Sequence, residues 1–260
     1  MRDKNSVSNI IRVALGVCLV CAVVVSTVAV TLRPMQQENR AAFRQLNVLQ
    51  AAGIYEPGID VADAFQRVER RIVNFDTGEY VDEPPGGFDP VRAARDPAQS
   101  RTLSGDPAGI GRRANYGEVF LARGEDGRLT RLILPVHAYG LWSTMFAFLA
   151  LEPDLKTVAG ISFFEHGETP GLGGEIDNPR WQESWVGKRV RDDDGDMVFR
   201  VDRGPTPEGV PDAEHRVDGL SGATITARGV ENMVRFWLGE KGYGPYLQNL
   251  ERRIRIGEEI

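Results

Sequence analysis

The strongest hydrophobic pattern is an uninterrupted apolar run near the N-terminus. Residues 13–32 contain no charged side chain and are bounded by Arg12 and Arg33. As a helix, at about 1.5 Å per residue, this run would be about 30 Å long, which matches the hydrocarbon core of a bilayer. A cleavable signal peptide has a shorter apolar region of about 7–15 residues and a small-residue cleavage site. The pattern therefore favours one uncleaved transmembrane helix over 13–32, after a short segment over 1–12.

The charges beside this run do not fix its orientation. Three basic side chains precede it and three follow it closely: Arg2, Lys4 and Arg12, then Arg33, Arg40 and Arg44. The positive-inside rule requires an excess on one side. Both cysteines of the chain, Cys18 and Cys21, lie inside the run. Because an apolar environment disfavours thiolates, we expect them to be small apolar side chains rather than a redox pair or a metal site.

Amphipathic helices are expected after the apolar run. Residues 39–52 have apolar side chains at helical spacing. A second helix is expected after an Asp60 cap, with apolar positions at helical spacing as far as Ile72. Prolines and glycines punctuate residues 82–111, which predicts a long irregular excursion. We therefore expect residues 33–113 to form a helical and irregular membrane-proximal region.

Strand patterns dominate the remainder of the chain. Strands are expected over four segments, 118–123, 129–136, 157–164 and 197–201. A hairpin turn is expected at 124–127. The acidic run 192–196 fits a solvated turn, because a calcium-binding EF-hand loop would place Met197 where glycine is required. The order of elements predicts an α+β domain over 114–260, with a mostly antiparallel sheet and flanking helices.

Composition excludes several classes of protein. The chain is 42% hydrophobic and 26% charged, which is typical of a folded protein. A formal net charge of −6 without a Lys/Arg-rich run argues against a nucleic-acid partner. Two cysteines and three scattered histidines argue against a disulfide framework and a zinc site. Local spacing brings together no nucleophile with a base, so a hydrolase has no support.

The most distinctive segment for chemistry lies near the C-terminus. Residues 218–224 read Asp-Gly-Leu-Ser-Gly-Ala-Thr, and an apolar helix face follows over 230–238. A helix N-terminus offers free N–H groups and the positive end of the helix dipole, which suit a phosphate. The small residues Gly222 and Ala223 would let a bulky group approach the backbone. A glycine turn with an ordinary N-cap threonine explains the same residues, so the residues alone leave both interpretations open.

Two further clusters are rich in glycine. The first, 138–145, is expected to be a strand end that continues into a short helix. Its Trp142 could wall a flat ring system or belong to the core. The second, 165–174, follows a strand but matches neither a P-loop nor GxGxxG. Its His166 is expected to be a hydrogen-bonded surface histidine.

Together these three clusters resemble the family of FMN-binding domains whose flavin is attached to a threonine through a phosphoester. Residues 218–224 are similar to the family's acceptor motif, Asp-Gly-x-Ser/Thr-Gly-Ala-Thr, at every constrained position. The resemblance implies that Thr224 carries FMN covalently, after a separate flavin transferase uses FAD to attach it. It implies that Asp218 belongs to the recognition pattern and that Thr226 is an N-cap. The other cofactor-binding residues it implies are Leu141, Trp142, Glu168, Thr169, Gly171, Leu172, Gly173, Ser221, Gly222 and Ala223.

The layout of nearly the whole chain is similar to the C subunits of Na⁺-translocating NADH:quinone reductases. The G subunits of Rnf ferredoxin:NAD oxidoreductase complexes are shorter siblings, and the length of residues 60–111 favours the first family. The resemblance implies an electron-carrier subunit of a multi-subunit pump in the bacterial inner membrane, with no complete catalytic site of its own. The N-terminus would be cytoplasmic and the main domain periplasmic. The alternative to an electron carrier is a non-catalytic binding module that is anchored in the membrane and has no redox function.

Overall fold

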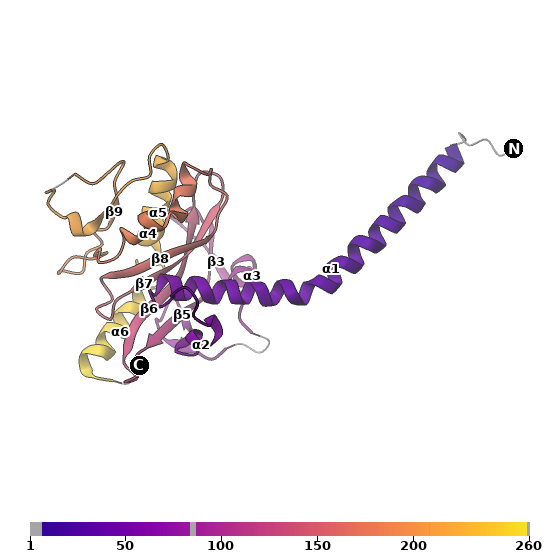
Figure 1. Cartoon of the computed structure of the whole chain (residues 1–260). Helices are drawn as coiled ribbons and strands as arrows, with labels where there is room; N and C mark the ends of the chain where they lie inside the picture. The colour runs from indigo at the N-terminus through magenta and orange to yellow at the C-terminus, as the bar shows by residue number, and fades with distance from the viewer. Residues whose placement is uncertain (1–6, 84–86, 208, 259–260) are drawn as a thin grey trace. The chain divides into compact units, whose positions relative to one another are not determined.

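The computed structural model describes residues 7–83, 87–207 and 209–258, and the chain divides into two compact units, Met1–Arg44 and Gln45–Ile260 (Figure 1). Residues 1–6 of the predicted segment 1–12, and residues 84–86 of the predicted irregular excursion, lie outside the described part.

Helix α1 (Val7–Ala51) contains the apolar run and continues through Pro34. Its most apolar window of 18 residues has a mean hydropathy of 2.8, so by length and composition it could cross a membrane. Most of the segment 39–52, which was expected as a helix of its own, is the C-terminal part of α1, which ends at Ala51. The chain leaves the helix at Gly53, whose φ of +67° suits glycine.

A six-stranded antiparallel sheet forms the centre of the second unit, in the order β2-β1-β5-β6-β7-β8. Its strands are β1 (Val68–Asn74), β2 (Tyr80–Val81), β5 (Tyr116–Arg123), β6 (Leu129–Tyr139), β7 (Thr144–Leu151) and β8 (Val158–Glu165). This confirms the predicted α+β fold, the hairpin between β5 and β6, and the strand expected over 157–164.

Shorter elements surround this sheet. The helices are α2 (Val61–Phe65), α3 (Pro90–Arg95), α4 (Pro179–Glu183), α5 (Thr224–Trp237) and α6 (Gly244–Ile256), with 3₁₀ turns η1 (Gly173–Asp177) and η2 (Ala213–His215). Strands β3 (Ser100–Thr102) and β4 (Arg112–Ala114) form an antiparallel pair, and β9 (Arg200–Val201) and β10 (Arg216–Val217) a parallel pair.

The sheet is covered on both faces, which explains why its central strands are nearly continuously apolar. Along β5, Val119 and Leu121 pack in the core cluster that contains α5 and α6 residues. Phe120 and Ala122 point to the other face, where they share a cluster with Val48 and Leu49. Successive side chains of a strand alternate between faces, so one strand supplies both cores.

The second predicted helix is only partly present. Asp60 caps α2 as expected, since its carboxylate accepts from the N–H of Ala62 at 2.8 Å. Residues 68–74, however, form strand β1, which pairs with β5. The four-residue interval between Val68 and Ile72 is even, so it fits the two-residue period of a strand as well as a helix. Because β1 joins the central sheet, the expected boundary between residues 113 and 114 falls inside one compact unit.

Two further expectations were wrong in detail. Residues 140–143 form a tight turn between β6 and β7 rather than a short helix, with Gly140 N–H donating to the Ser143 carbonyl at 2.8 Å. The strand expected over 197–201 is reduced to β9. The acidic run is a turn, as expected, closed by the Asp192 N–H and the Asp196 carbonyl at 3.1 Å.

A half-buried histidine makes the stability of the fold depend on pH. The His137 ring stacks on Phe146, with centroids 5.3 Å apart, and lies 4.8 Å from the Trp237 ring. Burial there lowers its pKa from 6.5 to about 4, although Asp106 opposes the shift. The neutral form is therefore favoured in the folded state.

We expect the free energy of unfolding to fall as the pH is lowered from about 6.5 toward 4, by about 2 kcal/mol between pH 6.5 and 5. The unfolded chain takes up a proton there that folded His137 excludes. Denaturant unfolding followed by tryptophan fluorescence checks this loss. A His137→Asn variant should lack it, and an equally steep pH dependence in that variant would contradict the assignment.

Candidate functional site

Glu168 lies where the three clusters of the sequence meet. Glu168 is only 4% exposed. Oε1 accepts from the backbone N–H groups of Leu141, Trp142 and Ser143 at 3.1, 2.9 and 3.3 Å. Oε2 accepts from the Thr226 hydroxyl at 2.6 Å and from Leu141 N–H at 3.1 Å. One carboxylate therefore joins the β6–β7 turn, the loop after β8 and the first turn of α5.

Two glycines leave the space that this carboxylate fills. A Cβ at Gly140 would lie 2.6 Å from Glu168 Oε1. A Cβ at Gly173 would lie 2.5 Å from Thr226 Oγ1 and 2.9 Å from Glu168 Oε2. The glycines of the first two clusters thus allow a buried carboxylate to approach both the turn and the helix.

The hydrogen bonds keep Glu168 charged. Burial by itself would raise the pKa of this carboxyl group, but the Thr226 hydroxyl and the N–H groups of residues 141–143 outweigh it and lower the pKa below its usual value. Hydrogen bonds to the charged form of an acid favour that form. Glu168 is therefore an ionised acceptor at neutral pH.

Thr224 is the first residue of α5 and is exposed. The N-cap is Ala223, and no side chain caps the helix there. The N–H groups of a first helical turn have no partner within the helix, so this end can receive a phosphate oxygen. Thr226 is not the predicted N-cap. It is the third helical residue, is 1% exposed, and its hydroxyl points to Glu168.

The loop before α5 is folded back tightly. Gly222 has a φ of +70°, and Ala223 N–H donates to the Leu220 carbonyl at 3.0 Å. Ser221 is exposed beside them. Asp218 does not reach the helix start: its carboxylate accepts from Thr206 N–H at 2.8 Å. Asp218 therefore anchors the beginning of the loop rather than its end.

Exposed apolar side chains accompany these polar groups. Leu141 is 41% exposed, Trp142 64%, Leu172 45% and Ile225 57%. The Leu172 side chain lies beside Gly222, where a Cβ would meet its Cδ2 at 3.0 Å. Of the two roles considered for Trp142, a place in the core is therefore wrong, because the side chain is exposed. Apolar side chains from two clusters, together with Ile225 directly after the third, suit a flat, largely apolar ligand.

The loop after β8 is ordered by its own hydrogen bonds. The Thr169 carbonyl accepts from the N–H groups of Leu172 and Gly174 at 3.1 and 2.9 Å. Gly171 adopts a φ of +76°. His166 is hydrogen-bonded as expected, since Nε2 lies 2.7 Å from Asp177 and Nδ1 accepts from Glu168 N–H at 3.1 Å.

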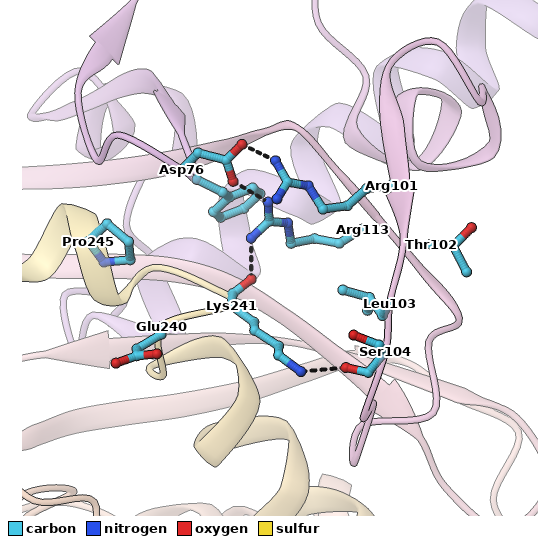
Figure 2. A pocket seen from close by; sticks show the side chains of 10 residues that line it. Asp76, Arg101, Thr102, Leu103, Ser104, Arg113, Glu240, Lys241 and Pro245 are labelled. Atoms are coloured by element: carbon cyan, nitrogen blue, oxygen red, sulfur yellow. Dashed lines mark hydrogen bonds and ion pairs between the residues drawn. The ribbon is translucent and has the colours of Figure 1, made fainter.

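A separate pocket of about 390 Å³ contains none of the predicted site residues. Figure 2 shows Asp76 accepting from Arg101 and Arg113, while Arg113 also donates to the Lys241 carbonyl. Lys241 in turn donates to the carbonyl of Ser104. Burial, with Arg101 nearby, lowers the pKa of Arg113 to about 10. Because these cations already have partners within the protein, we interpret the network as structural.

Among the residues that the structure describes, no group of three or more His, Cys, Asp or Glu side chains could hold a metal ion.

Several known proteins are similar to this chain in sequence and in fold. The model of the FMN-binding domain family matches residues 140–239, which include two of the three clusters completely and residues 140–145 of the other. The chain is 46% identical over 255 residues to the C subunit of the Na⁺-translocating NADH-quinone reductase of Yersinia pestis, covering 96% of this chain and 95% of that one. It is 46% identical over 259 residues to the C subunit of the same reductase in Pseudomonas aeruginosa, covering 97% and 99%.

A solved structure of the same kind of subunit has a similar fold. The crystal structure of Shewanella oneidensis NqrC superposes with a TM-score of 0.74 at 37% identity, covering 80% of this chain and 96% of that one. The fold and the site thus define an FMN-binding flavoprotein domain. The chain belongs to the NqrC family, the C subunits of the Na⁺-translocating NADH-quinone reductases.

The sequence predicted Glu168 as a site residue, but it did not indicate which groups the carboxylate would contact. Its partner Thr226 lies 58 residues further along the chain, and its other donors are backbone groups of a turn that was expected to be helical. The signal in the sequence that relates to these contacts is the set of glycines in the two clusters, 138–145 and 165–174.

Proposed function

We propose that this chain is the electron-carrier subunit of a Na⁺-translocating NADH:quinone reductase and that FMN is bound through a phosphoester to Thr224. The observation that carries this proposal is the exposed Thr224 at the start of a helix that no side chain caps. Bound FMN would supply reversible electron transfer. The protein's part is to hold the flavin and to shape its surroundings.

The residues present fit such a group. The N–H groups at the start of α5 would receive the phosphate, with Gly222 and Ala223 leaving room beside it. Trp142, Leu172 and Ile225 would contact the ring system through their exposed apolar surfaces. The covalent bond is tested by denaturing the protein and measuring whether the flavin remains attached to it.

The family resemblance supports the partners. The relatives described above are named as C subunits of a Na⁺-translocating reductase, which favours that complex over an Rnf complex. We therefore propose the other subunits of the pump as permanent partners, and a flavin transferase as the partner during maturation.

Helix α1 and the same resemblance support a proposal for the location. We propose that α1 anchors the chain in the bacterial inner membrane, with a cytoplasmic N-terminus and a periplasmic main domain. A covalent bond would keep the flavin from being lost on that side, where free FMN is scarce.

Reporter fusions check this orientation. Alkaline phosphatase fused to the C-terminus of the full chain should be active, because it folds only after export, whereas green fluorescent protein in the same place should be dark. A phosphatase fusion to a cytoplasmic protein is the control. A fluorescent C-terminal fusion with an inactive phosphatase fusion would reverse the proposed orientation.

A further inference from the structure

Glu168 touches more of the proposed FMN site than any other side chain described above, yet it is buried. Its carboxylate receives donors from the β6–β7 turn and from α5, while its own backbone belongs to the loop after β8. We propose that Glu168 is the positioning residue that assembles the FMN site before the flavin is attached. This proposal rests on the proposed function of Thr224.

The chemistry of the donors requires an ionised carboxylate. The turn supplies three backbone N–H groups and the helix a hydroxyl, at distances of 2.6 to 3.3 Å. Only an ionised carboxyl group accepts on both oxygens without carrying a donor. Without Glu168, the turn N–H groups of residues 141–143 would lose these acceptors, so the turn would no longer be held to the loop.

The bond to Thr226 also sets the direction of Thr224. Successive residues of an α-helix are about 100° apart, so residues two apart point about 200° from each other. Thr226 is 1% exposed and bonded to Glu168, whereas Thr224 is exposed. By holding Thr226 inward, Glu168 fixes the first turn of α5 and presents the Thr224 hydroxyl outward.

The crowding around the carboxylate supports a dedicated role. Gly140 and Gly173 both leave space that a Cβ would take from Glu168 or Thr226. The loop, the turn and the helix therefore fit together around this one charge. In contrast, Glu165 lies three residues earlier on the same segment and is exposed, which makes it a matched control.

The test combines two measurements on the full-length protein in detergent. The first is the initial rate of flavin transfer from FAD by a purified flavin transferase. The second is amide hydrogen exchange in the protein before flavin attachment, which needs no cofactor. The variants are Glu168→Ala, Thr226→Val and Thr226→Ser, with Glu165→Gln as control.

We expect Glu168→Ala and Thr226→Val to slow flavin transfer by about tenfold or more, the scale of a lost hydrogen bond to a charged group. In Glu168→Ala, exchange at residues 141–143 should accelerate by a similar factor, while amides in the middle of β6 and β7 keep their protection. Thr226→Ser keeps the hydroxyl and should restore the rate. Glu165→Gln should behave as wild type. If Glu168→Ala does not fold, the comparison of Thr226→Val, which is nearly isosteric, with Thr226→Ser shows whether the hydrogen bond to Glu168 is needed for flavin transfer.

Three outcomes would overturn the proposal. The first is a normal transfer rate with unchanged protection of the turn in Glu168→Ala. The second is loss of protection throughout the sheet, which would make Glu168 a general stabiliser. The third is a failure of Thr226→Ser to recover what Thr226→Val loses. If the wild-type protein accepts no flavin, the proposed function of Thr224 is refuted instead. The hydrogen-exchange data would then still show whether Glu168 holds the turn at residues 141–143.

Discussion

Replacing Thr224 with alanine is expected to abolish the attachment of flavin. The Thr224 hydroxyl is the group that would displace AMP from FAD and become the ester oxygen, and alanine has no oxygen there. Wild-type protein made with an active flavin transferase should fluoresce on a denaturing gel, and Thr224→Ala should be dark. Thr102→Ala, an exposed threonine far from the three clusters in sequence, is the control and should keep its fluorescence.

The same substitution should leave the fold almost unchanged. Thr224 is the first helical residue rather than the N-cap, and no side chain caps α5. Its loss should therefore change the free energy of unfolding by no more than about 0.5 kcal/mol, as at other exposed positions. Loss of a true N-cap costs about 1 kcal/mol. A stable, dark variant supports an acceptor role, whereas a fluorescent variant would show that another residue carries the flavin.

The second large effect is expected at the pocket of Figure 2. The Arg113 side chain is 3% exposed and Asp76 is its carboxylate partner at 2.8 Å. Asp76→Asn leaves the buried charge of Arg113 without a counter-charge and close to Arg101. Because Asp76 itself is 43% exposed, we expect a loss of about 2 kcal/mol, below the roughly 3–5 kcal/mol of a fully buried pair.

Denaturant unfolding measures this loss, and two further variants sharpen it. Arg113→Met removes the buried charge together with its need for a partner, so it should cost less than Asp76→Asn. Glu251→Gln breaks an exposed pair with Arg255 and should cost less than about 0.5 kcal/mol. Flavin attachment should be normal in all three, since none of the predicted site residues lines this pocket. An Arg113→Met variant that is less stable than Asp76→Asn would contradict this account.

The fold was predictable where a period was unambiguous. The hairpin of β5 and β6 follows from two strand-like segments on either side of the turn at 124–127, and the amphipathic helix α5 follows from helical spacing. Strand β1 was not recognised, because its apolar residues, four positions apart, fit both periods. What resolved this ambiguity is the pairing of β1 with β5, a contact between distant segments that a local pattern does not contain.

Candidate residues for the site could be selected from the sequence, but their arrangement could not. Glycine clusters and the acceptor motif indicated three segments, and the structure brings these segments together around Glu168. The inward position of Thr226 depends on Glu168, 58 residues away, so the sequence suggested an N-cap where the structure has a buried hydroxyl. Likewise, the exposure of Trp142 depends on a tight turn, which no spacing of apolar residues indicated.

Covalent flavin at Thr224 is tested most directly by the intact mass of the full-length protein, denatured and purified after expression with and without an active flavin transferase. Attachment at Thr224 predicts an increase of one FMN minus one water, only when the transferase is active, with the increment located on the peptide that contains Thr224. An unmodified mass beside a transferase that is demonstrably active would contradict covalent attachment, and would favour a membrane-anchored module that binds its ligand reversibly.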